Sequence, residues 1–176
     1  YLKYKFLRYD NLGIDIGTRV NTVSFTPGGE FLLEPRVNMT YRLSNPIAIK
    51  LGWGIFQQEI TTISDEKEVI SLFEPWIITP EYLNPARSTH YTGGLEIDLT
   101  SKLNLQIEGY YKKVKDLPFI NEEKVFDDDN DLVGGEGESY GLETLLKYSD
   151  KPLSLTTSYS LSYAYNTVNN WKFYPK

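Results

Sequence analysis

YGLETLLKYSDKPLSLTTSYSLSYAY, residues 140–165, alternates between two kinds of side chain on both sides of a short turn. Every second position is apolar or hydroxyl-bearing, from Tyr140 to Tyr148 and again from Leu153 to Tyr165. The positions between them carry the charges Glu143 and Lys147. Because successive side chains of a strand point to opposite faces, this pattern predicts two antiparallel strands with one charge-free face and one polar face.

The same alternation runs through the whole chain. It predicts strands at 1–8, 12–22, 34–43, 47–60, 87–100, 103–117, 138–148 and 153–166. The charge-free face includes Ile16, Met39, Trp53, Ile107 and Leu155, and charges such as Lys5, Asp15 and Arg42 fall on the other face. A charge that faces lipid at the bilayer midplane costs roughly 2–4 kcal/mol, whereas a charge in a water-filled lumen stays solvated. The pattern therefore predicts an all-β, antiparallel, up-and-down wall of a transmembrane β-barrel with about eight strands.

The predicted connections alternate in length. Short turns are expected at 9–11, 44–46, 101–102 and 149–152, and long loops at 23–33, 61–86 and 118–137. Most predicted strands are longer than the roughly 5–6 residues of soluble sheets, and they match the about 9–11 residues that span a bilayer. Outer-membrane barrels have short periplasmic turns and longer extracellular loops. We therefore expect the three long loops to lie at one end of the sheet, outside the cell.

The composition agrees with this prediction and excludes several other classes. The chain has 176 residues with 14 Tyr and 3 Trp, which suit aromatic girdles at membrane boundaries. Its net charge of −6 argues against a nucleic-acid-binding protein, and the absence of Cys excludes disulfides and thiolate metal sites. The chain contains no apolar run of about 18 residues, so the sequence predicts no transmembrane helix.

An open wall is favoured over a small closed barrel. Eight strands can in principle close on themselves. However, the chain starts and ends within the pattern, and 171–176 reads as a loop with no following strand. The predicted inward face is also rich in glycine, which suits a broad wall; these positions are Gly13, Gly17, Gly52, Gly54 and Gly94. We therefore expect strand 1–8 to remain unpaired with strand 153–166.

Several stretches resemble the barrel of TonB-dependent outer-membrane receptors. They are EPRVNMTYRLSNPIAIKLGWGIFQQ at 34–58, NPARSTHYTGGLEIDL at 84–99, LQIEGYYKKVKDLP at 105–118 and GEGESYGLETLLKYSDKPLSLTTSYSLSYA at 135–164. The order of these motifs carries the resemblance, and Ala86 replaces an acidic residue common in the family. The resemblance implies a 22-stranded barrel filled by a plug, of which residues 1–176 form part of a single barrel domain. The plug and the final strands would lie outside these residues.

The resemblance also implies a location and partners. The location is the outer membrane of a Gram-negative bacterium. The expected partners are outer-membrane lipid, the protein's own plug domain and the TonB complex. The cargo would be a scarce nutrient, such as a siderophore with iron, cobalamin, an oligosaccharide or a peptide, with no cofactor and no nucleic acid.

Candidate site residues fall into three groups. Charged and aromatic residues are predicted to face the lumen or the plug: Arg19, Arg36, Lys50, Glu96, Asp98, Glu108, Tyr110 and Glu143. In the loop at 61–86, three aromatic residues are candidate ligand contacts: Phe73, Trp76 and Tyr82. The acidic loop offers a weak calcium candidate with D-x-D-x-D spacing, formed by Asp127, Asp129, Asp131 and Glu138, although Leu132 stands where the turn demands Gly.

Three functions remain open at this point. Active nutrient uptake is favoured, a passive porin-like channel is the first alternative, and a soluble β-sheet ligand-binding module is the second. An enzyme is not expected. His90 is the only histidine, and Ser88 lies two residues away, but the sequence identifies neither a third group nor oxyanion donors for hydrolytic chemistry.

Overall fold

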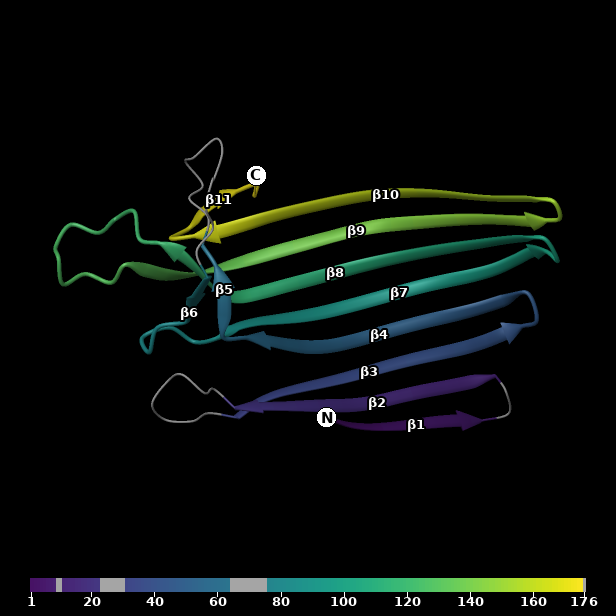
Figure 1. The fold of residues 1–176 in the computed structure, drawn as a ribbon, viewed down its shortest axis with the longest axis horizontal. Helices are drawn as coiled ribbons and strands as arrows, with labels where there is room; N and C mark the ends of the chain where they lie inside the picture. The colour runs from purple at the N-terminus through teal and green to yellow at the C-terminus, as the bar shows by residue number, and fades with distance from the viewer. Residues whose placement is uncertain (9–10, 23–30, 64–75, 176) are drawn as a thin grey trace.

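The computed structural model describes residues 1–8, 11–22, 31–63 and 76–175, and every regular element in this part is a β-strand. Nine strands form one antiparallel sheet in the order β1-β2-β3-β4-β7-β8-β9-β10-β11 (Figure 1). Among these residues, no helix is long and apolar enough to cross a membrane. The strands are β1 (Leu2–Arg8), β2 (Leu12–Thr22), β3 (Phe31–Ser44), β4 (Ile47–Gln58), β5 (Ile60–Thr62), β6 (Trp76–Ile78), β7 (Ala86–Thr100), β8 (Leu103–Ile120), β9 (Leu132–Asp150), β10 (Leu153–Val168) and β11 (Trp171–Phe173).

The described loops and turns are sorted to opposite ends of the sheet, as predicted. The turns β3–β4, β7–β8 and β9–β10 lie together at one end (Figure 1). Strands β5 and β6, and the loop between β8 and β9, lie at the other end (Figure 1). At this end, the Leu132 amide at the start of β9 donates a hydrogen bond to the phenol of Tyr82, which follows β6, at 3.3 Å. The predicted turn at 9–11 and loop at 23–33 fall largely outside the described residues.

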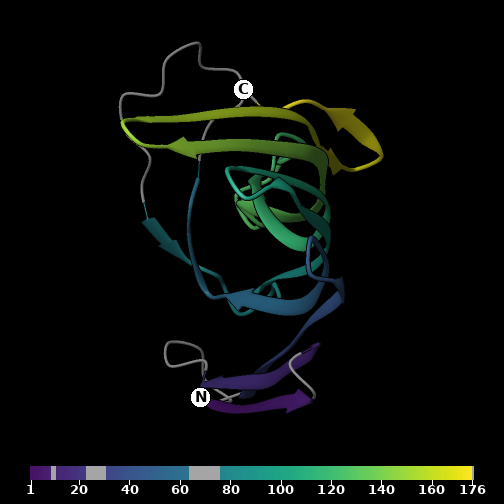
Figure 2. The same ribbon diagram turned by 90° about the vertical axis from the view of Figure 1, so that its right-hand side faces the viewer.

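The sheet is curved and open. Figure 2 shows it bending from the β9–β10 hairpin round to β1 and β2. Its edges are β1 and β11, so the described strands do not close into an eight-stranded barrel. This confirms the prediction of an open antiparallel wall.

Two boundaries predicted in the loop region were wrong. Strand β8 continues to Ile120 and β9 begins at Leu132, because pairing resumes as Leu117↔Gly135 after a register irregularity. The loop predicted at 118–137 therefore covers only residues 121–131. The chain after Asn170 is also not a simple loop, since β11 pairs with β10. Asn169 and Asn170 have φ values of 47° and 69°, the left-handed backbone that a tight hairpin turn requires.

The strand register separates an apolar face from a polar face. Paired residues share a face, and the row Leu95↔Ile107↔Thr144↔Tyr159 crosses four strands without a charge. Glu108 pairs with Gly94 and Glu143 on the opposite face. This arrangement confirms the predicted facing.

No second sheet covers the apolar face among the described residues. Leu155 remains 58% exposed and Tyr159 62% exposed. The total accessible surface is 12611 Å² for 20.3 kDa. A folded soluble monomer of that mass would expose about 8,800 Å². Among the described residues, the buried ones are few and scattered, namely Leu32, Glu34, Ala48, Gly54, Thr79, Pro118, Gly135 and Gly137. The fold is therefore a wall without a conventional core, as expected of a sheet whose apolar side faces lipid.

Candidate functional site

The polar face gathers the side chains that the sequence predicted to face the lumen or the plug. The register places all eight on this face, because each pairs with residues of the polar set. All of them except Tyr110 form two clusters, one near the loop end around Arg36 and one in the middle of the wall around Lys50.

A buried carboxylate organises the cluster near the loop end. Glu34 is only 3% exposed. Its carboxylate accepts hydrogen bonds from Arg36 Nη2 at 2.9 Å, from the Gln57 backbone amide at 3.1 Å and from Asn21 Nδ2 at 3.4 Å. A buried charge is costly unless it is paired and hydrogen-bonded, and these three donors satisfy it. Glu34 therefore fixes the position of Arg36. The sequence analysis did not single out Glu34, because its position alone gives no sign of burial.

Arg36 continues into an aromatic stack on the same face. Its guanidinium lies 4.4 Å from the centre of the Phe56 ring, and the Phe56 and His90 rings are also 4.4 Å apart. Gly54 leaves room for this stack, since a Cβ there would lie 3.1 Å from the Phe56 ring and 3.3 Å from Arg36 Cγ. The result is a preorganised cationic and aromatic surface.

The His90 ring does not form a hydrolytic triad with Ser88. His90 Nε2 lies 2.7 Å from Ser88 Oγ, and both residues sit on β7 two positions apart. The ring packs against Phe56, and within the described ranges no carboxylate is hydrogen-bonded to it. A histidine that activates a nucleophile needs such a partner to orient it. The contact is better explained as a polar pair within the wall.

A polar hollow of about 370 Å³ lies in the middle of the wall. Lys50 Nζ pairs with Glu96 at 2.5 Å, and Asn104 Nδ2 donates to Asp98 at 2.8 Å. Glu108 and Glu143 lie directly opposite each other on neighbouring strands. Like charges at such positions repel each other. The hollow therefore combines a neutralised pair with two carboxylates held side by side.

Tyr110 lies between these two clusters. Its ring packs across the backbone of Gly141, where a Cβ would lie only 2.8 Å from the ring, and Lys112 Nζ is 5.1 Å from the ring centre. Arg19, in turn, donates to Asn21 at 2.9 Å. Both of these contacts join residues two positions apart on a single strand.

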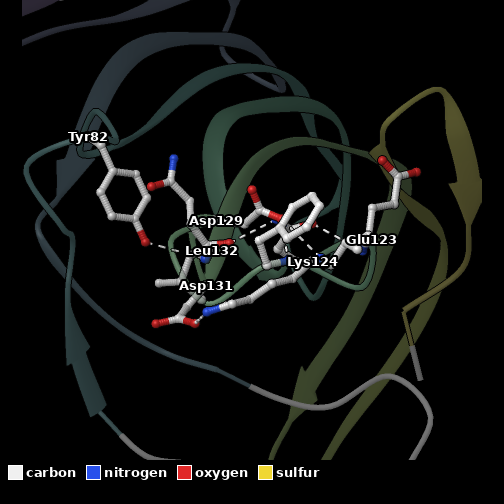
Figure 3. Close-up of polar contacts among 10 residues, drawn as sticks. Tyr82, Glu123, Lys124, Asp129, Asp131 and Leu132 are labelled. Atoms are coloured by element: carbon white, nitrogen blue, oxygen red, sulfur yellow. Dashed lines mark hydrogen bonds and ion pairs between the residues drawn. The ribbon is translucent and has the colours of Figure 1, made fainter.

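The external segments carry two of the three predicted ligand contacts. Trp76 begins β6 and is 72% exposed. Tyr82 is 47% exposed, and its phenol points toward Leu132 (Figure 3). Phe73 lies outside the described residues. Trp76 and Tyr82 are therefore both accessible at the loop end of the sheet.

The acidic loop does not gather a calcium site. The Asp129 carboxylate accepts the Phe126 and Val125 amides at 2.9 and 3.0 Å, and Lys124 Nζ pairs with Asp131 at 2.7 Å (Figure 3). The hydrogen bond from the Phe126 amide contributes most to lowering the pKa of Asp129, and the bond from the Val125 amide adds to it. Glu138 lies within β9 and accepts the Tyr165 hydroxyl. Within the described part of the chain, no three His, Cys, Asp or Glu side chains are placed to hold a metal ion.

An apolar pocket at the loop end was missed by the sequence analysis. It has a volume of about 480 Å³ and includes Phe119, Trp171 and Phe173. The Phe119 and Phe173 rings meet edge to face at 5.8 Å. Glu122, Glu123 and Lys172 add charge to the lining. The tight Asn169-Asn170 turn was the available signal, because it predicts a hairpin that returns the chain beside β10.

Comparison with known proteins agrees with this geometry. The sequence model described as TonB dependent receptor-like, beta-barrel matches residues 5–175. No curated protein matches the chain significantly. The matched residues include the whole two-faced wall from β2 to β11 and most of β1. The chain therefore belongs to the TonB-dependent receptor family, whose members are outer-membrane receptors, as part of the family's β-barrel.

Proposed function

We propose that the protein imports a scarce nutrient across the outer membrane of a Gram-negative bacterium, with energy supplied through the TonB complex. The cargo would be a siderophore with iron, cobalamin, an oligosaccharide or a peptide. The observation that carries this proposal is the two-faced wall. One face is apolar, and the other holds fixed polar groups such as Arg36 and Glu108.

The two faces have different partners in this proposal. The apolar face contacts lipid, as the exposure of Leu155 and Tyr159 supports. The polar face contacts the protein's own plug domain and lines the path of the nutrient. The Glu34–Arg36–Phe56 cluster suits such a contact, because its cation is held in place before any partner arrives. A soluble sandwich would bury its apolar face, and that face remains uncovered in the described residues.

The first contacts with the nutrient would lie at the loop end. Trp76 and Tyr82 are exposed there, and the pocket around Phe119 and Trp171 adds a concave apolar surface. Aromatic side chains on loops above a rigid scaffold are common ligand contacts. Phe73 belongs to the same proposal from its sequence position.

The decisive experiment compares energised and passive uptake in cells. A strain without the intact protein should fail to grow when its nutrient is limiting, and radiolabelled candidates from the four cargo classes identify that nutrient. A protonophore should abolish uptake if transport is TonB-coupled. Uptake that continues with the protonophore would contradict the proposal and favour a passive channel.

A pair of variants tests the role of the polar face. Arg36→Ala removes the fixed cation, and we expect slower uptake at a normal surface level of the protein. Thr157→Ala, on the apolar face opposite Leu146, is the matched control and should leave uptake unchanged. Equal uptake by both variants would refute the assigned role of Arg36.

A further inference from the structure

A hollow on the apolar face is formed where two glycines meet. Gly93 of β7 and Gly109 of β8 are directly opposite each other, between the pairs Tyr91↔Tyr111 and Leu95↔Ile107. The hollow has a volume of about 600 Å³. Tyrosines and leucines from four strands line it, namely Tyr91, Tyr111, Tyr140, Leu142, Leu161 and Tyr163.

Neither glycine is required by the packing of the wall. A Cβ at Gly109 would meet only the Gly141 and Gly93 carbonyl oxygens, at 3.8 and 4.0 Å. A Cβ at Gly93 would meet only Leu51 Cδ2, at 3.7 Å. Neither has a left-handed φ, so side chains fit both positions. Glycine weakens a strand interior and often marks a place where a ligand approaches the backbone closely.

Cations lie on the same face, toward the loop end. Arg87 lies directly opposite Lys115, and it is four residues along β7 from Tyr91, or about 13 Å of strand. Like charges directly opposite each other on one face are destabilising. Both side chains are exposed, and no ion pair to either occurs within the described ranges. An anion between them would relieve the repulsion.

The surrounding charges leave this region positive. Tyr91, Tyr111, Tyr140 and Tyr163 pair across four strands as one tyrosine row. Lys113 lies between this row and the Arg87–Lys115 pair, and its Nζ is 2.9 Å from the Glu136 carboxylate and 3.5 Å from that of Glu138. Lys172 Nζ lies 3.4 Å from the centre of the Tyr165 ring. On β7 and β8, Arg87, Lys113 and Lys115 therefore bring three cations to the loop end of the apolar face, and the carboxylates of Glu136 and Glu138 pair with Lys113 alone among them. The predicted charge-free face thus ends above the tyrosine row.

We propose that the Gly93–Gly109 hollow and the Arg87–Lys115 pair together bind one phosphate-bearing lipid of the outer leaflet. One acyl chain lies in the hollow, the tyrosines flank the interfacial region of the lipid, and the phosphate lies between Arg87 and Lys115. Arginine suits this role because its planar fork matches phosphate oxygens. The inference rests on the proposed function, because it requires the loop end to face the outer leaflet.

The test is lipid binding to the intact protein, purified in a nonionic detergent and observed by native mass spectrometry. The probes are bisphosphorylated lipid A, the same lipid without its phosphates, and inorganic phosphate. The wild-type protein should retain the bisphosphorylated lipid more tightly than the dephosphorylated one. Inorganic phosphate at millimolar concentration should not displace it. Displacement by phosphate alone would show an ion site and overturn the proposal.

Two kinds of variant separate the two halves of the site. Arg87→Gln with Lys115→Gln should weaken binding of the bisphosphorylated lipid by about 25-fold, at about fivefold per cation. This double variant should leave the dephosphorylated lipid unaffected. Gly109→Leu fills the hollow and should weaken both lipids. Unchanged binding in either variant would overturn the corresponding half of the site.

Matched controls keep the result specific. Lys151→Gln removes an exposed cation at the opposite end, and Thr157→Leu adds a similar side chain to the apolar face away from the hollow. Both should bind lipid as the wild type does, and all variants should show the heat-modifiable gel mobility of a folded barrel. Loss of lipid binding with intact uptake would separate this site from transport. Passive uptake with intact lipid binding would refute only the transport mechanism.

Discussion

Ile107→Lys should strongly destabilise the folded protein in a bilayer, because Ile107 lies midway between two aromatic rows of the apolar face. On β9, Tyr148 pairs with Leu103 and Tyr140 pairs with Tyr111, and Ile107 pairs with Thr144 halfway between them. The eight residue steps from Tyr140 to Tyr148 span about 27 Å of strand. At a strand tilt of roughly 40° this is about 21 Å along the membrane normal, close to the about 25 Å apolar band of such barrels.

A lysine at this depth should cost about 2–4 kcal/mol. At 25 °C this corresponds to roughly a 30- to 900-fold lower folding equilibrium constant. The neighbouring residue supplies the control. Glu108→Lys changes the polar face, where it would replace the Glu108–Glu143 repulsion with an attraction, so its effect should be neutral or stabilising by about 0.2–1 kcal/mol.

The measurement is urea-induced unfolding of the intact protein in lipid vesicles, followed by heat-modifiable gel mobility. Tyr111→Lys extends the comparison, because the cost near the interface should fall to about 0–1 kcal/mol. If Ile107→Lys and Glu108→Lys lowered stability equally, the assignment of the two faces would be wrong.

Two further predictions concern the loop end. The Asp129 carboxylate accepts the Phe126 and Val125 amides, so its folded pKa lies below its unfolded value, and the turn is stabilised above the unfolded pKa. Hydrogen-exchange protection of both amides should therefore persist at pH 5 and disappear as pH falls through the folded pKa, and protection that is unchanged at pH 2 would contradict this. Asn170→Val should cost about 1–2 kcal/mol in the left-handed turn and expose the β11 amides to exchange, whereas Asn170→Gly should not, and equal protection in the two variants would contradict the turn assignment.

The fold could be predicted because the sheet repeats one physical rule along every strand. A single register error would turn all side chains of a strand to the other face, so the alternation fixes the pairing as well as the strands. Ile107 and Glu108 show this clearly, since adjacent residues fall on opposite faces as predicted. The rule fails where the wall leaves the membrane. There the irregularity after Val114 and the hairpin to Trp171 depend on local backbone geometry.

The site was only partly predictable for a different reason. Alternation places Arg36 and Lys50 on the polar face, but it does not say which partner each side chain reaches. Glu34 became central only through donors from Asn21 and Gln57, which lie 13 residues before and 23 residues after it. Contacts between distant residues depend on curvature of the sheet, and no local pattern encodes them. The weak calcium candidate around Asp129 shows the same limit, because its spacing does not reveal that the Asp129 carboxylate accepts amides of its own turn.

The bond from the Leu132 amide to the Tyr82 phenol has a consequence for how selectivity arises. Leu132 is the first residue of β9, so its amide is anchored to a strand that cannot slide without exposing the wrong face. The bond therefore ties the segment that carries Tyr82 to the start of β9, and the register of β9 sets the position of both along the sheet. Among the described residues, three residue pairs join β5 to β6, so Trp76 is held by a much shorter ladder than the strands of the wall. If the protein imports a nutrient as proposed, its choice of cargo can therefore change through β5 and β6 while the Tyr82–Leu132 connection and the wall stay constant.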